Sequence, residues 1–531
     1  MYRCKGTITV FLSLISMLFL SLFCTMAESA RVQAARVQAA AAFDMGLFSV
    51  FGEYDSVLLE EYDIWFFDAA RQAGRFSKDI LETALSGYIS PNIHVTDGIS
   101  AAKTWNLFPT EMEVCIVDKY ALATDDGGEV FCRQAVENEK ELFAGNTALA
   151  LRNNINEIKQ QEKKGEQYIK EEQAAEESLQ NAQEEQRRLL EEGKGAGQDQ
   201  QAQGAQGAGS KGEGDLGAPA GGAGVQGKAE NPLESIKKLK KLGILSLVMK
   251  DVSRISDKRL EINDLPSNRV LHKGNLKVKG GSTGALSQLV FLEYLKNHFT
   301  CASAEKQEKG RVHALSYELE YIAAGKRSDM ENLKKVANKL LLLREGVNYV
   351  CIMGSTAMRE EAMALAAAIA GAAAPPLAAA LQKAIMLAWA YGESILDVRT
   401  LLSGGKVPLT KTEAEWKLSL GSLGRLTEVL DECDRGKRGG QSYEEYLAGI
   451  LALEQQKKRN LRALDLIEAN RRMEKGGEGF RADALVAQME AHAAFELAPV
   501  FLAVPSIWMQ ITNQGTAYFM KGQYGYMEGG V

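Results

Sequence analysis

The longest uninterrupted hydrophobic pattern in the chain lies near its beginning. Residues 7–27 are 21 consecutive positions without a charged side chain. At about 1.5 Å of rise per residue, a helix of this length spans roughly 30 Å, the thickness of the hydrocarbon core of a bilayer. The pattern therefore predicts a transmembrane anchor helix over 7–27, preceded by a short leader over 1–6. The side chains expected to contact lipid are Thr7, Ile8, Val10, Phe11, Leu12, Leu14, Ile15, Leu18, Phe19, Leu20, Leu22 and Phe23.

The charges on either side of this segment bear on its orientation. Arg3 and Lys5 precede it and favour a cytoplasmic N-terminus, while Arg31 and Arg36 follow it, so the asymmetry is small. The short leader is easily retained in the cytoplasm while large downstream domains are exported. A cleaved signal peptide ending near Ala27 is the alternative, but the apolar run exceeds the usual core of about 7–15 residues. We expect a single-pass protein of the cell membrane with its bulk extracellular.

The helical pattern continues beyond the apolar segment. Residues 28–51 contain no proline and are rich in alanine, glutamine and arginine, which favour helix. Val32, Ala35 and Ala39 recur at helical spacing, and further apolar positions continue this stripe to Phe51. We therefore expect one helix of more than 40 residues. Its first half is apolar on all sides, and its second half docks one face on a globular domain.

A small α+β unit is predicted over residues 52–150. Within it, residues 113–123 and 130–136 have strand-like patterns on either side of an Asp-Asp-Gly-Gly sequence that favours a tight turn. The pattern predicts a β-hairpin. In that hairpin Cys115 and Cys132 would not face each other, so a disulfide between them is disfavoured.

Two long segments with few apolar positions follow. Residues 151–192 are dominated by Glu, Gln, Lys and Arg, and their aliphatic side chains are too sparse for a two-stranded coiled coil, so they predict a solvated helical stalk. Residues 193–230 are mostly glycine, alanine and glutamine, with 13 glycines between 193 and 228. Such a composition cannot bury enough apolar surface to offset chain entropy, so we expect a disordered linker there.

A helical domain is predicted over residues 231–483. Within it, residues 362–381 carry no charge and resemble a second membrane span, but 12 of them are alanine and Pro375 and Pro376 interrupt them. Close packing between helices explains this segment better. Segments with helical periodicity, separated by breaks that mostly contain glycine or proline, are 284–300, 311–325, 328–345, 356–373, 377–403, 411–432 and 442–473.

The final segment, residues 484–531, changes to strand-like patterns over 484–497, 516–520 and 524–527. We expect these strands to join the predicted hairpin in one small antiparallel sheet, with the helices as a separate layer or bundle. The predicted fold class is therefore α+β and mostly helical, with a long N-terminal transmembrane helix, a sheet completed by C-terminal strands, a helical bundle and a disordered linker.

Composition and charge restrict the function. The 531 residues include 62 basic and 69 acidic side chains, a net charge of −7, which lacks the basic footprint of a nucleic-acid-binding protein. Seven cysteines in this length do not make a disulfide scaffold, and five scattered histidines make a histidine-built metal site improbable. No phosphate-binding loop, dinucleotide-binding or zinc-protease motif occurs. We therefore expect neither nucleic acid, metal nor cofactor.

Two pairs of side chains are the candidates for chemistry. Glu393 and Asp397 lie at positions i and i+4 of a predicted helix, where their carboxylates would be about 5–6 Å apart, a spacing that suits retaining glycoside hydrolysis. A structural ion pair with Arg399 is the simpler interpretation. His298 and Cys301, at i and i+3, would supply two metal ligands, but no further soft ligand lies nearby, so a packed helix end is favoured.

Two further segments allow either an interaction surface or core packing. Residues 235–250 alternate lysines with leucines and isoleucines, a pattern that suits binding to anionic lipid or wall polymer as well as docking of an apolar helix face. The aromatic segment 62–67 would suit a membrane interface, but more than 30 residues separate it from the anchor helix, which favours core packing.

The first residues also resemble a known family. Lys5 and Gly6 followed by the sequence TITVF resemble the start of the TadE/TadG-like minor pilins of tight-adherence (Flp) systems. In that family a prepilin-type peptidase can cut after a glycine at the membrane face, so the resemblance implies that Gly6 is a processing site. The apolar helix then enters a pilus or stays as an anchor. Phe11 stands where pilins usually carry a glutamate, which argues against a polymerising major subunit.

A second resemblance covers much of the chain. Residues 317–349 and 387–420, together with 62–68 and the N-terminal segment, resemble domain of unknown function family 5702 of Gram-positive anaerobes. This resemblance implies a topology but no reaction. We therefore expect a non-enzymatic, membrane-anchored surface protein, a pseudopilin-like or envelope-assembly component whose partners are the bilayer and pilin-like or envelope proteins. The alternatives are an anchored cell-wall hydrolase or transferase that uses Glu393 and Asp397, and a membrane sensor.

Overall fold

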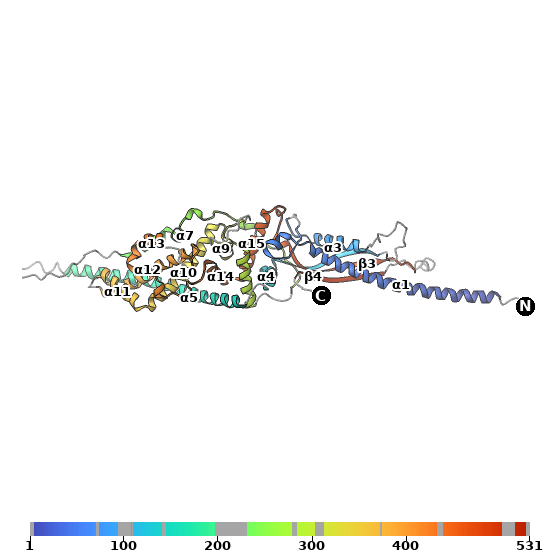
Figure 1. The fold of residues 1–531 in the computed structure, drawn as a ribbon, viewed down its shortest axis with the longest axis horizontal. Coiled ribbons are helices and arrows are strands. Elements are labelled where there is room, and N and C mark those ends of the chain that lie inside the picture. The colour runs from blue at the N-terminus through green and yellow to red at the C-terminus, as the bar shows by residue number, and fades with distance from the viewer. Residues whose placement is uncertain are drawn as a thin grey trace, which may run out of the picture.

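Helix α1, Lys5–Gly52, projects from one end of the computed structural model, and a mostly helical domain occupies the other end (Figure 1). An antiparallel sheet lies between them, alongside the second half of α1. The fold is mostly helical, as expected. The structure describes residues 5–70, 74–93, 108, 110–140, 145–196, 231–278, 284–302, 313–371, 374–432, 439–501 and 516–526.

Helix α1 is continuous over 48 residues, which confirms the prediction of one long N-terminal helix. In its second half, Ala35, Ala39, Phe43 and Leu47 are each no more than 3% exposed. These residues repeat every four positions, so they form one buried stripe along the helix. The docked face predicted from the sequence is therefore present.

The sheet is built around strand β3, Leu485–Leu497. β3 is antiparallel to β2, Thr110–Leu122, on one side and to β4, Thr516–Gly525, on the other. The two-residue strand β1, Phe67–Asp68, pairs with the start of β3. The small antiparallel sheet with C-terminal strands was therefore predicted correctly, although the segments expected at 516–520 and 524–527 belong to one strand up to Gly525.

Helices α1 and α3, Lys78–Ile93, cover one face of this sheet. At Gly522 of β4, a Cβ atom would lie 2.9 Å from Cε1 of Phe43 and 3.0 Å from Cδ1 of Leu47, so glycine allows α1 to lie directly on the strand. The core between these layers includes Phe43, Leu47, Leu81, Leu85, Ile89, Val117, Leu122, Met489, Ala491 and Phe495.

The predicted hairpin is wrong in its second strand. Residues 130–136 belong to helix α4, Asp125–Glu139, which follows β2 directly. Asp126, Gly127 and Gly128 do adopt positive φ angles, but this turn leads into a helix. Val130, Phe131, Cys132, Ala135 and Val136 are buried at helical spacing in the core that α4 shares with α8 and α15.

The prediction of a solvated stalk over 151–192 is wrong for the first half of helix α5, Gly145–Ala196. Its first half packs against helices α10, α12 and α14, and Ile155, Ile158 and Tyr168 are buried there. At Gly346 of α10 a Cβ atom would lie 2.4 Å from the backbone nitrogen of Gly165, so two glycines permit the close crossing of these helices. α5 therefore belongs to the helical domain.

The helical domain contains most of the helices expected from the periodicity of residues 284–473, with shifted ends. The helix expected over 411–432 is wrong for its larger part, because 3₁₀ turns and irregular chain precede a short α-helix there, and the segment expected over 442–473 is divided into two helices. Short 3₁₀ helices η1 to η5 occupy Val252–Arg254, Ile262–Asp264, Glu413–Glu415, Leu420–Arg425 and Ala482–Ala484. Helix α2, Ser56–Tyr62, precedes the sheet. The α-helices of the domain beyond α5 are α6 Pro232–Leu242, α7 Ile244–Val248, α8 Ala285–His298, α9 Glu318–Ala324, α10 Asp329–Gly354, α11 Thr356–Ala370, α12 Pro375–Leu402, α13 Leu426–Glu432, α14 Tyr443–Leu453 and α15 Gln456–Met473.

The segments with alternative interpretations have packing roles in the described residues. The alanine-rich stretch 362–381 is divided between α11 and α12, with Gly371 at a φ of 79° between them, and its Ala362 and Ala366 are buried. Helix α6 buries Ile236 and Leu239 against the domain. The predicted linker over 193–230 lies outside the described residues from residue 197 onward.

Glu345 of α10 generates a prediction about pH. Burial raises the pKa of its carboxyl group to about 8, despite the opposing charge of Lys240. Because the folded-state pKa is raised, the stabilisation that protonated Glu345 provides is fully present below the unfolded pKa near 4.5. It is lost as the pH rises through about 8. Replacing Glu345 with glutamine should flatten the fall in unfolding free energy between pH 5 and 8, a slope of at most about 1.4 kcal/mol per pH unit.

Urea unfolding measured across that pH range checks this prediction. Glu360→Gln, which removes an exposed carboxyl group on the neighbouring helix α11, is the matched control and should leave the slope unchanged. A Glu345→Gln protein with the same pH dependence as the original chain would show that Glu345 does not retain its proton in the folded state.

Candidate functional site

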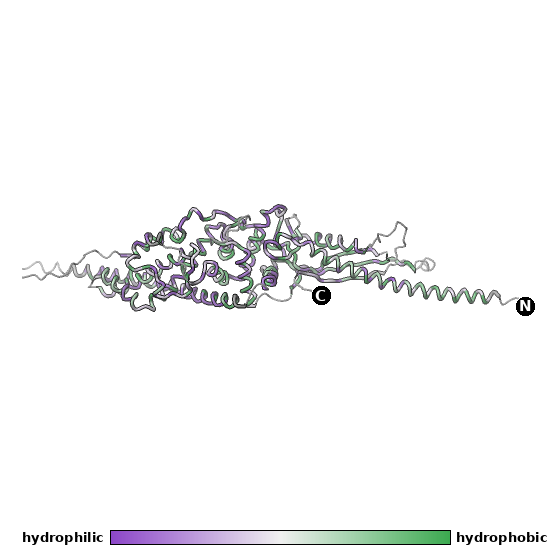
Figure 2. Tube along the Cα trace, in the orientation of Figure 1, coloured by the Kyte–Doolittle hydropathy of each residue, from purple (hydrophilic) through white to green (hydrophobic). Residues whose placement is uncertain are grey.

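Within the described residues, no side chain of α1 between residues 7 and 27 is buried by the rest of the protein. An 18-residue window within this helix has a mean hydropathy of 2.3 and none of its residues is buried. Phe11, Leu18 and Phe23 are each more than 60% exposed, and Figure 2 shows the projecting half of the helix as hydrophobic. Among the described residues, α1 is the one helix long and apolar enough to cross a membrane. Gly6 lies in its first turn, immediately before the apolar segment.

Three of the hydroxyl side chains inside this segment form hydrogen bonds within the helix. The Ser13 hydroxyl donates to the carbonyl of Val10 at 2.8 Å, and the Thr25 hydroxyl donates to the carbonyl of Leu22 at 2.8 Å. Ser21 bonds to its own preceding turn in the same way. A hydroxyl group in hydrocarbon finds no water, so these internal bonds reduce the cost of placing the segment in lipid.

Helix α1 is clamped to the sheet at the point where its apolar segment ends. The Glu28 carboxylate accepts hydrogen bonds from the backbone nitrogens of Phe501, at 2.9 Å, and Val500, at 3.4 Å. Arg31, one turn further on, pairs with Glu28 and donates to the carbonyl of Ala498 at 2.6 Å. We call Glu28, Arg31 and residues 498–501 the clamp.

The electrostatics of the clamp favour the ionised carboxylate. Burial raises the pKa of Glu28, but the hydrogen bonds from Arg31 and from the Phe501 backbone outweigh burial and hold the pKa below its usual value. Because β3 ends at Leu497, the clamp joins α1 to the chain immediately after the central strand. It therefore fixes where the helix leaves the folded body.

Glu393 and Asp397 lie together on α12, but as a buried ion cluster. Their side chains are 0% and 2% exposed, and Lys411 binds both carboxylates, at 2.7 Å from Oδ1 of Asp397. Arg344 of α10 adds an ion pair to Asp397 at 3.0 Å. Glu393 also accepts from the backbone nitrogen of Leu418 at 2.8 Å. Every charge in this cluster is compensated.

The pKa of Asp397 reflects this compensation. Burial raises it, but Lys411 and Arg344 together lower it to about 2. A general acid in glycoside hydrolysis needs a raised pKa and access to substrate, and this carboxylate has neither property. The partners of the pair are Lys411 and Arg344 rather than Arg399, whose guanidinium donates to the carbonyl of Leu247 at 3.1 Å.

His298 and Cys301 also have packing roles. Nδ1 of His298 lies 2.9 Å from the carbonyl oxygen of Glu61, and its ring packs on Tyr294 with centroids 4.4 Å apart. Cys301 is 2% exposed. Within the described parts of the chain, no group of three or more potential ligands has the arrangement that a metal ion requires.

The sequence indicated the apolar helix but not the contacts that orient it. Glu28 and Arg31 have the spacing of a helical ion pair, yet nothing in the pattern connects them with residues 498–501. In the same way, Glu393 and Asp397 were recognised as neighbours, whereas Arg344 and Lys411 come from separate elements. Partners this distant along the chain leave no local periodic signal.

Replacing Lys411 with methionine should destabilise the helical domain. The change would leave two buried carboxylates with one cation, and removing one partner of a buried ion pair costs roughly 3–5 kcal/mol. Chemical unfolding of the two proteins gives the difference directly. Lys406→Met, at an exposed lysine of the same loop, should stay within about 0.5 kcal/mol of the original chain. Equal stability of both variants would contradict the assignment of a buried cluster.

Replacing Glu28 with alanine should release the clamp. We expect the backbone amides of Val500 and Phe501 to exchange hydrogen roughly tenfold faster, because a hydrogen bond to a charged group contributes about 1.5–3 kcal/mol. Since the pKa of Glu28 is lowered in the fold, acidification through that pKa should have the same effect on the original chain. Asp44→Ala, at an exposed carboxylate of α1, should change neither rate, and equal protection in both variants would exclude the clamp.

Comparison with known proteins identifies the family of the larger part of the chain. A family model described as a family of unknown function (DUF5702) matches residues 223–497, which is 275 of 531 positions. The match extends from before α6 to the last residue of β3. The search of curated proteins and the search of solved structures each gave no match. Because the matched region exceeds half of its length, the chain belongs to the DUF5702 family of unknown function.

Proposed function

We propose that this protein is a non-enzymatic, single-pass membrane protein that holds a helical interaction domain on the outer side of a cell membrane, with its N-terminus in the cytoplasm. The observation that supports this most strongly is the unburied apolar half of α1, which ends at the clamp. A segment that is apolar on all sides and unburied among the described residues is stable in lipid or in the interior of a fibre, but not in water.

The clamp gives the anchor a defined geometry. In this proposal the end of β3 at Leu497, beside the clamp, lies next to the membrane boundary, while Leu485 at the other end of β3 packs in the core of the helical domain. From Glu28 to Gly52 the helix rises about 36 Å at 1.5 Å per residue. We infer that the helical domain stands beyond this distance from the bilayer, where it can meet partners in the envelope.

A pilin-like lateral contact is part of the proposal. On the exposed side of α1, Val37, Met45 and Phe48 are 70%, 47% and 66% exposed, and Ala41 lies between them at helical spacing. The stripe ends beside the sheet, where the ring of Phe48 meets Tyr524 of β4 edge to face. This apolar stripe continues the lipid-facing surface beyond the membrane boundary. It suits packing against a pilin-like or other envelope helix, in keeping with the resemblance of the first residues to TadE/TadG-like minor pilins. We propose a Gram-positive cell as the source, as the resemblance to the DUF5702 family implied.

Protease treatment of intact protoplasts tests the anchor and its orientation together. Lys211 and Lys228 lie in the glycine-rich segment, so external trypsin should cut there and leave an N-terminal fragment in the membrane. Because β3 of the C-terminal fragment pairs with β1 and β2 of the N-terminal fragment, the two fragments should remain attached to each other until urea is added.

Two outcomes would contradict the proposal. Protection of the chain in intact protoplasts, with cleavage only in inside-out vesicles, would show that the orientation is the opposite of the one proposed. Recovery of the full-length chain as a soluble protein in the medium would show that the apolar segment does not anchor it. A Phe48→Ser variant, which changes the exposed stripe but not the apolar segment, should remain in the membrane and serves as the matched control.

A further inference from the structure

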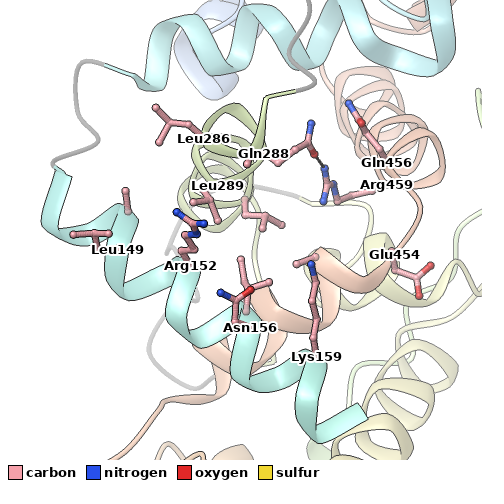
Figure 3. Close-up of a pocket in the computed structure, with 15 residues that line it drawn as sticks. Leu149, Arg152, Asn156, Lys159, Leu286, Gln288, Leu289, Glu454, Gln456 and Arg459 are labelled. Carbon is pink, nitrogen blue, oxygen red and sulfur yellow. Dashed lines mark hydrogen bonds between the residues drawn. The ribbon is translucent and has the colours of Figure 1, made fainter. Parts of the chain in front are cut away.

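A groove opens in the helical domain where α5, α8 and the start of α15 meet (Figure 3). Its volume is about 550 Å³, a size typical of sites that bind one small organic molecule. Helix α5 forms one wall, and its Leu149, Arg152, Asn156 and Lys159 repeat every three or four residues and project toward the groove. The groove lies outside the clamp and outside the buried ion cluster.

The groove is apolar along its length and cationic at its edges. The apolar lining comes from α5 and α8 and includes Leu149, Ile155, Leu286, Leu289 and Leu292. Arg152 and Lys159 are exposed, and neither forms an ion pair within the described residues. The acidic residue of the lining, Glu454, lies 3.8 Å from both Lys339 and Arg462, which offset its charge.

Arg459 is the lining side chain that most strongly indicates a ligand. It lines the groove from α15 and is only 3% exposed. Its guanidinium donates to the side-chain oxygen of Gln288 and, at 3.4 Å, to the carbonyl of Leu451, while its Nε has no hydrogen-bond partner in the part of the chain that the structure describes. The group also lies over the ring of Phe291, 5.3 Å from its centroid.

Among the described residues, no carboxylate compensates the buried charge of Arg459. Across the described residues, Arg459 has no ion pair within 4.0 Å, and burial lowers its pKa. Arg344, equally buried in the same domain, has Asp397 at 3.0 Å. A buried cation without an anion is destabilising, and a guanidinium offers five N–H donors, of which Arg459 uses two. The geometry is therefore incomplete without an anionic group.

We propose that this groove binds an amphiphilic anion, a small molecule with one carboxylate or phosphate group on an apolar chain or ring. The anionic group would meet Arg459 and Arg152, since an arginine fork matches carboxylate and phosphate oxygens. The apolar part would lie along Leu286 and Leu289. The inference goes beyond the proposed anchor function and does not depend on it, because the groove is formed entirely within the helical domain.

Equilibrium dialysis of the full chain in phosphatidylcholine nanodiscs tests the proposal, with empty nanodiscs correcting for partition into lipid. Labelled decanoate and decyl phosphate are the two anionic probes, and they distinguish a carboxylate from a phosphate ligand. We expect one or both to bind saturably with one molecule per chain. Decanol, which lacks the charge, and inorganic phosphate, which lacks the apolar chain, should each bind at least about tenfold more weakly.

Variants locate the binding. Arg459→Gln should weaken binding of the anionic probe at least about tenfold, and its melting temperature shows whether it folds. Arg152→Gln, at an exposed position, should weaken binding about threefold, and Arg152→Gln with Lys159→Gln more strongly, because screened surface charges contribute less. Arg187→Gln on the same helix, where the side chain is 81% exposed and far along α5 from the groove, should bind as the original chain does.

Several results would overturn the proposal. Equal binding of decanol and decanoate would show that charge plays no part, and equal binding of inorganic phosphate would show that the apolar lining plays none. Absence of saturable binding for both anionic probes would show that the groove is not a binding site for amphiphilic anions. If Arg459→Gln does not fold, unchanged binding in the Arg152→Gln, Lys159→Gln double variant would overturn the assignment equally well.

Discussion

The structure depends first on keeping the beginning of α1 away from water. Its large apolar side chains from Ile8 to Met26 are mostly more than half exposed. Burying one such side chain contributes about 1.5–3 kcal/mol, so leaving a dozen of them in water would exceed the roughly 5–15 kcal/mol that stabilises a folded domain. The segment therefore needs lipid or other helices around it. The internal hydrogen bonds of Ser13 and Thr25 fit the same requirement.

The sheet connects α1 to the rest of the chain and so fixes the position of the helical domain relative to it. β2 comes before the helical domain in the sequence and β3 comes after it, and Val117 pairs with Ala491. Most of the helical domain is thus inserted between two neighbouring strands, and its position relative to α1 is set by the sheet and by the clamp rather than by the glycine-rich segment. The DUF5702 match includes β3 but not β2, so the sheet joins the family region to the N-terminal part that carries the anchor.

Local periodicity was enough to predict α1, most helices of the helical domain and the C-terminal strands. It failed where one pattern fits two structures. Residues 130–136 are short and apolar, so they suit a strand, and only packing against α8 and α15 makes them a helix. Helix α5 seemed too polar to pack, but Gly165 and Gly346 bring it close enough to α10 for a few apolar side chains to suffice.

The polar sites were harder to predict because their partners are distant in sequence. The spacing of Glu393 and Asp397 correctly placed two carboxylates side by side, yet their environment, and therefore their chemistry, is decided by Arg344 and Lys411. The clamp joins Glu28 to Phe501, and Arg152 and Arg459 line the same groove from different helices. Only Glu393 and Asp397 were recognised from the sequence, and the other members of these sites come together through the fold.

The most direct test of the anchor is the N-terminus of the mature protein taken from its native membrane, measured by intact mass and terminal sequencing. We expect every mature molecule to retain residues 7–27, with its first residue at Met1 or, after processing behind Gly6, at Thr7. A mature protein that begins downstream of Glu28 and remains in solution would contradict this expectation, because the apolar half of α1 would then have no role in the functional molecule.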